Sequence, residues 1–131
     1  MGVDINSVGT ILYWCEGSRR ERDYRIEFVN SDPVMIRVFM KYLRTKGVDE
    51  KRIRARISIH EQDDVTECVE YWKGVTSLHD SNFLTASVRK TSPARVPLPY
   101  GTITIRYNSI ALLRQVKAEI SAMGQELLRV E

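Results

Sequence analysis

Residues 53–60 constrain the fold more than any other segment, because apolar and polar side chains alternate along them without a break. The apolar set is Ile53, Ala55, Ile57 and Ile59, and the polar set is Arg54, Arg56, Ser58 and His60. A period of two is typical of a β-strand with one face in a core and the other exposed. Residues 24–29, 83–90 and 101–108 show the same alternation. We therefore expect four strands in one sheet, with a basic and polar outer face.

Amphipathic helices are predicted between and around these strands, where apolar residues recur every three or four positions. They begin near residues 8, 33, 63 and 109. Asn6 or Ser7 is the expected N-cap of the first helix and Ser31 or Asp32 that of the second, with Pro33 at its first position. Helices that cover one face of an antiparallel sheet predict an α+β fold. The order is αββαβαββα if a short strand precedes residue 24.

The bulk properties fit one domain over residues 1–131, because this length supports a single core. No stretch approaches the roughly 18 apolar residues of a membrane span, and no signal peptide is expected at the start. Cys15 and Cys68 lie in apolar segments without metal-ligand spacing, which predicts buried free thiols in a cytoplasmic protein. The net charge of +3 is a weak indication of an anionic partner.

The predicted outer face of the sheet is rich in Arg, Ser and Thr, which are the residue types that contact phosphates and base edges. A sheet of this kind can lie along the major groove of DNA. The alternative is an ordinary solvated sheet face, and Glu27 on the same face favours that alternative. The proline-rich loop after Lys90 contains Arg95. It either follows the DNA backbone past the edge of the sheet or is a plain surface loop.

The sequence lacks the residue patterns of most enzyme active sites. The glycines do not form a phosphate-binding loop, and His60 and His79 lack the spacing of a catalytic triad or a zinc site. Glu16 differs, because it ends an almost wholly apolar helix, where a charge is costly unless it has a partner. Either Glu16 binds a cation or it marks the point where the helix emerges into solvent.

Residues 9–17 (GTILYWCEG) resemble the motif of the LAGLIDADG family, whose homing endonucleases carry an apolar helix that ends in an acidic residue and a glycine. Residues 25–33 and 100–108 are similar to the second and final strands of this family. The resemblance implies an αββαββα core with a saddle-shaped antiparallel four-stranded sheet, to which this chain adds a helix. It also implies a homodimer, because one motif copy per chain must pair with a second copy on a pseudo-palindromic site of double-stranded DNA.

The resemblance assigns roles to individual residues. It implies that Glu16 binds Mg²⁺ (with Ca²⁺ or Mn²⁺ as substitutes), that Gly17 turns the chain at this metal site, and that Arg106 stabilises the scissile phosphate. Asn30, or its neighbour Asp32, would hold the attacking water. The dimer contact would use Val8, Gly9, Leu12, Tyr13 and Cys15. The DNA contacts are expected at Arg19, Arg20, Arg25, Arg54, Arg56, Ser58, His60, Thr85, Ser87, Arg89, Lys90, Arg95, Thr102 and Thr104.

The function implied by this reading is site-specific, Mg²⁺-dependent hydrolysis of duplex DNA by a homodimer. Two alternatives remain open. The first is a DNA-binding or regulatory protein of similar fold that does not cut DNA. The second is a protein-interaction domain whose sheet face is merely solvated.

Overall fold

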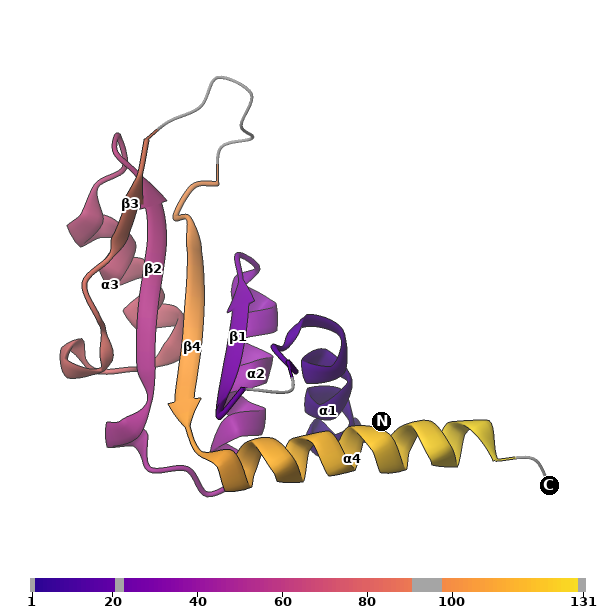
Figure 1. Cartoon of the computed structure of the whole chain (residues 1–131). Helices are drawn as coiled ribbons and strands as arrows, with labels where there is room; N and C mark the ends of the chain where they lie inside the picture. The colour runs from indigo at the N-terminus through magenta and orange to yellow at the C-terminus, as the bar shows by residue number, and fades with distance from the viewer. Residues whose placement is uncertain (1, 21–22, 91–97, 130–131) are drawn as a thin grey trace.

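A computed structural model describes residues 2–20, 23–90 and 98–129, and within them four helices and four strands form an α+β fold (Figure 1). The main elements, in chain order, are α1 (Ile5–Glu16), β1 (Arg25–Asn30), α2 (Pro33–Thr45), β2 (Arg54–His60), α3 (Val65–Thr76), β3 (Ser87–Arg89), β4 (Thr102–Asn108) and α4 (Ile110–Leu128). Short 3-10 turns lie at Glu50–Arg52 and Asp80–Asn82. None of the helices described is long and apolar enough to span a membrane.

The sheet is mixed, with the strand order β1-β4-β2-β3. β4 pairs antiparallel with β1 and β2, whereas β3 runs parallel to β2. The prediction of a fully antiparallel sheet is therefore wrong at β3. The physical reason is the crossover through α3, which returns the chain to the end of the sheet where β2 began. The strand predicted over 83–90 is also shorter, since only an isolated bridge joins Phe83 to Ala55 ahead of β3.

Local capping chemistry sets most helix ends. The Asp32 carboxylate accepts hydrogen bonds from the backbone N–H groups of Val34 and Met35 at the start of α2, as expected. Ser109 caps α4 in the same manner. The first helix starts earlier than predicted, because Asp4 rather than Asn6 or Ser7 is its cap.

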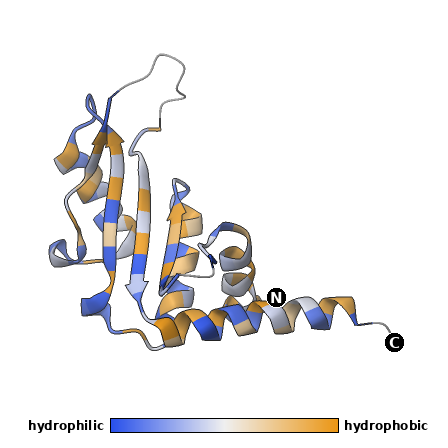
Figure 2. Ribbon diagram, in the orientation of Figure 1, coloured by the Kyte–Doolittle hydropathy of each residue, from blue (hydrophilic) through white to orange (hydrophobic). Residues whose placement is uncertain are grey.

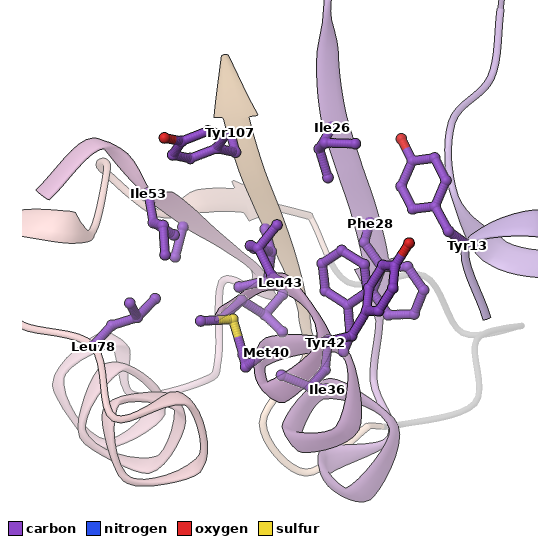
Figure 3. Packing of buried hydrophobic residues seen from close by; sticks show 14 of the residues in the cluster. Tyr13, Ile26, Phe28, Ile36, Met40, Tyr42, Leu43, Ile53, Leu78 and Tyr107 are labelled. Carbon is purple, nitrogen blue, oxygen red and sulfur yellow. The ribbon is translucent and has the colours of Figure 1, made fainter. Parts of the chain in front are cut away.

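The core lies between one face of the sheet and helices α2 and α3, which Figure 1 shows behind the strands. Along the strands, Figure 2 shows apolar residues alternating with polar ones, as the sequence predicts. Phe28 of β1 stacks on Phe39 of α2 with ring centroids 4.2 Å apart. Figure 3 shows Phe28 together with Tyr13 and Tyr42, which come from α1 and α2. The buried face thereby fixes which side of the sheet is left open.

The two cysteines differ in their surroundings. Cys68 is buried in α3, and this burial raises the pKa of its thiol. Cys15 is exposed, so the prediction that both thiols are buried is wrong for Cys15. The exposure of Cys15 depends on how α1 packs in the tertiary structure, which the apolar run in the sequence did not reveal.

Candidate nucleic-acid interface

The open face of the sheet carries its polar side chains in rows that cross the strands. In one row Glu27 of β1 lies opposite Arg106 of β4, which in turn lies opposite Arg54 of β2. The next row contains Val29, Thr104 and Arg56. On the four strands the outward positions include five arginines and a single carboxylate, Glu27. The face is therefore cationic, although the net charge of the whole chain is small.

Glu27 binds two of these arginines. Its Oε1 accepts a hydrogen bond from Arg106 Nε at 2.9 Å and another from Arg25 Nη2 at 3.1 Å. The three side chains are partly exposed, between 18% and 28%. Glu27 also offsets the repulsion between Arg106 and Arg54, which face each other across β4 and β2. Arg106, predicted to act on the scissile phosphate, is thus engaged with Glu27 in the middle of the sheet face.

Arg54 and Arg56 of β2 are anchored to backbone carbonyls. Arg54 Nη1 donates to the carbonyl oxygens of Lys51 and Ile53, and Arg56 Nη1 donates to that of Thr85 at 3.1 Å. Such bonds hold each guanidinium group in a defined orientation without neutralising its charge. Both arginines therefore remain cationic and face outward.

Hydroxyl groups occupy the next part of the face, where Thr102, Ser58 and Ser87 are in register on three adjacent strands. Hydroxyls donate to phosphate oxygens and base edges alike. Arg89 and Lys90 are exposed beyond them, Thr85 is exposed just before β3, and Arg95 lies outside the described residues.

His60 does not behave as predicted for a DNA contact. Only 9% of the residue is exposed, and its Nδ1 has no hydrogen-bond partner among the described residues. Strand alternation places it on the outer face, but the end of β2 is covered by the turn that leads into α3. The Asp63 carboxylate in that turn accepts a hydrogen bond from the His60 backbone N–H at 2.9 Å.

Glu16 ends α1 as an exposed side chain without an ion pair or side-chain hydrogen bond among the described residues. The last turn of α1 contains no basic residue. A carboxylate at a helix C-terminus is disfavoured by the helix dipole, so this position favours a nearby cation. No group of three metal-ligating side chains forms within the described residues.

Tyr13 fixes the turn after Glu16 against the sheet. Its hydroxyl donates to the Ser18 carbonyl oxygen at 2.7 Å and accepts from the Glu27 backbone N–H at 3.0 Å. A Cβ atom at Gly17 would lie 2.4 Å from the Tyr13 ring, so only glycine allows this close approach. The physical role of Gly17 is thus to pack beneath Tyr13, which brings the end of α1 next to β1.

The ionisation of Tyr13 should make the fold sensitive to alkali. Burial raises the pKa of Tyr13 to about 12, above the ordinary value of 10.0. The resulting stability is complete below pH 10 and is lost as the pH rises through 12, because the unfolded chain releases the proton first. The free energy of unfolding of Tyr13→Phe should be lower at neutral pH by about 1 to 3 kcal/mol, since the Glu27 N–H loses its acceptor. Between pH 10 and 12, the free energy of unfolding of Tyr13→Phe should also fall less than the free energy of unfolding of the unmodified chain.

Urea unfolding over this pH range tests the prediction. Tyr24→Phe is the matched control, because Tyr24, which directly precedes β1, is 53% exposed. An equal alkaline loss in Tyr13→Phe and the unmodified chain would contradict the role given to Tyr13.

Two residues predicted for the dimer contact are buried inside the chain instead. Gly9 faces Tyr42 of α2, and Tyr13 packs near Phe39 with ring centroids 6.1 Å apart. Neither is free to contact a second copy. Val8, Leu12 and Cys15 remain partly or fully exposed, and Ile11 between them is 44% exposed. The outer side of α1 is therefore an apolar stripe that ends at Glu16.

Asn30 and its neighbour Asp32 are engaged in the turn into α2. Asn30 Oδ1 accepts from the backbone N–H groups of Ser31 and Asp32, while Nδ2 contacts Met35 Sδ at 2.9 Å. The described contacts do not bring Asn30 or Arg106 to Glu16. In the loop after α1, Arg20 pairs with Asp23 at 3.1 Å and Arg19 is exposed.

Two residues, Glu27 and Tyr13, organise this surface in ways that the sequence does not show. Glu27 is the single acidic residue on a basic strand face, and by itself it favours an ordinary solvated surface. Tyr13 is predicted as a dimer contact in an apolar helix, and nothing in the sequence indicates its hydroxyl contacts. No protein-family model, curated protein or solved structure matches this chain.

Proposed function

We propose that this chain binds a specific site on duplex DNA through the open face of its sheet, as a homodimer, and cleaves the DNA with Mg²⁺. The observation that carries the proposal is the one-sided sheet, whose outward positions hold five arginines, several hydroxyls and one carboxylate. Arginine, serine and threonine side chains on adjacent strands suit both the phosphates and the base edges of the major groove. The resemblance of residues 9–17 to the LAGLIDADG motif supports the same proposal.

The homodimer is supported by the outer side of α1. Its apolar residues Val8, Ile11 and Cys15 are partly or fully exposed and Leu12 is only partly buried against the core, so pairing two such helices would remove these side chains from water. In a dimer of this kind the two Glu16 carboxylates lie near the two-fold axis, where Mg²⁺ would offset their repulsion. The metal supplies charge neutralisation at a scissile phosphate and lowers the pKa of a bound water.

The test is cleavage of a supercoiled plasmid library by the purified protein with Mg²⁺. Glu16→Gln should abolish cleavage yet leave DNA binding and folding intact, because the side chain is exposed and has no intrachain partner among the described residues. Glu50→Gln is the matched control, since it removes a partly exposed carboxylate that pairs with Arg44 of α2. Equal cleavage by Glu16→Gln would exclude the metal role.

A second candidate function is sequence-specific binding without cleavage. It is favoured by the engagement of Arg106 with Glu27 and by the absence, within the described part of the chain, of any group of three metal-ligating side chains. A gel-shift that shows specific retention, with the DNA still intact in Mg²⁺, would establish this candidate. Failure to retain any DNA, even at low salt, would exclude both candidates and favour a protein-interaction domain.

A further inference from the structure

Glu27 is placed on the surface where the proposed function requires contact with DNA, although a carboxylate repels phosphate. Its side chain is 18% exposed and lies on the edge strand β1, opposite Arg106 of the central strand β4. A carboxylate covered by a docked duplex is costly unless each oxygen meets a donor. On DNA the available donors are the amino groups of bases, so the position of Glu27 indicates a base contact.

The hydrogen bonds of Glu27 leave part of its capacity free. Both arginines bind the same oxygen, Oε1, and no described residue donates to Oε2. Arg106 uses only Nε in this contact, so neither of its two Nη groups is engaged by a described residue. The pair therefore presents a carboxylate acceptor beside a guanidinium fork, and the Arg25 contact holds the acceptor in place.

We infer that Glu27 and Arg106 together read one C·G base pair in the major groove of the bound DNA. Cytosine offers its N4 amino group to a carboxylate, and guanine offers O6 and N7 to an arginine fork. An A·T pair lacks two adjacent acceptors on one base, so it leaves half of the fork unsatisfied. The inference rests on the proposed DNA binding, and it makes Glu27 and Arg106 specificity-determining residues rather than general contacts.

The experiment selects bound duplexes from a randomised pool and sequences them, for the unmodified chain and for Glu27→Gln. The unmodified chain should require C·G at one position of each half-site. Glu27→Gln should reduce that preference about tenfold or more at this position alone. Arg106→Lys should weaken the preference at the same position, because lysine lacks the fork. The control is Glu50→Gln, which makes the same charge change away from the sheet face.

The outcomes separate the inference from the function on which it rests. Unchanged base preferences in Glu27→Gln, with or without a uniform gain in affinity, would overturn the inference and leave DNA binding intact. In that case the role of Glu27 would be only to orient Arg25 and Arg106. Loss of preference at different positions in Glu27→Gln and Arg106→Lys would also overturn it. If the unmodified chain retains no duplex from the pool, the proposed function fails together with the inference.

Discussion

Replacing Gly9 by alanine should destabilise the chain by at least about 3 kcal/mol, the upper part of the range for overpacked cores. A Cβ atom at Gly9 would lie 2.0 Å from Cγ of Tyr42. Tyr42 is 1% exposed and packs beside Phe39, so its ring has no space into which it could move. Helix α1 would have to separate from α2, which would also break the contact between Thr10 and the Tyr42 hydroxyl.

Urea unfolding of the purified variants measures this effect, and Gly124→Ala is the matched control. A Cβ atom at Gly124 would make an ordinary contact with Trp14 at 3.5 Å. Since Gly124 lies inside α4, alanine there should stabilise the helix by up to about 1 kcal/mol. The loss in Gly9→Ala should not depend on protein concentration, because the clash is within one chain. Wild-type stability for Gly9→Ala would contradict the described packing of α1 on α2.

Replacing both Arg54 and Arg56 by alanine should raise the dissociation constant for DNA about thirtyfold or more. Each side chain is expected to contribute roughly 1 to 3 kcal/mol if it contacts a base, and 1.4 kcal/mol corresponds to a tenfold change. The two arginines are neighbours on the outer face of β2, with their guanidinium groups oriented by backbone carbonyls. If they contact phosphates instead, the number of counterions released on binding, measured from the salt dependence of the affinity, should fall by roughly two.

The control for this pair is Arg37→Ala with Lys41→Ala. These residues are exposed on α2, which covers the opposite face of the sheet, and their removal changes the net charge equally. Titration of a labelled duplex in both variants separates the sheet face from a general effect of charge. Equal losses of affinity in the two variants would mean that binding follows net charge alone. An unchanged dissociation constant in the Arg54 and Arg56 variant would exclude the sheet face as the DNA-binding surface.

The ion pair between Lys46 and Glu119 shows how the helices hold α1 in position. Lys46 Nζ, just after α2, contacts both carboxylate oxygens of Glu119 in α4 and also Oδ1 of Asn6 in α1. The Lys46 side chain is 7% exposed, so the contact is largely shielded from solvent. These contacts join three helices at one point and so hold α1 against α2 and α4.

The features that the sequence alone determined are those that depend on neighbouring residues. The alternation over 53–60 predicted β2 and its two faces, and Asp32 with Pro33 predicted the start of α2. Both predictions were confirmed, because strand faces and helix caps are set within a few residues of the same segment. The basic outer face followed from the same alternation.

The features that only the tertiary structure decided depend on which distant segments meet. The parallel pairing of β3, the burial of His60 and the partners of Gly9 and Tyr13 all involve contacts between separate elements. Glu27 is the main case, because its effect on the surface depends on Arg106, 79 residues away in the chain. A sequence pattern records the type of side chain at each position, whereas strand order and register decide which charges face one another.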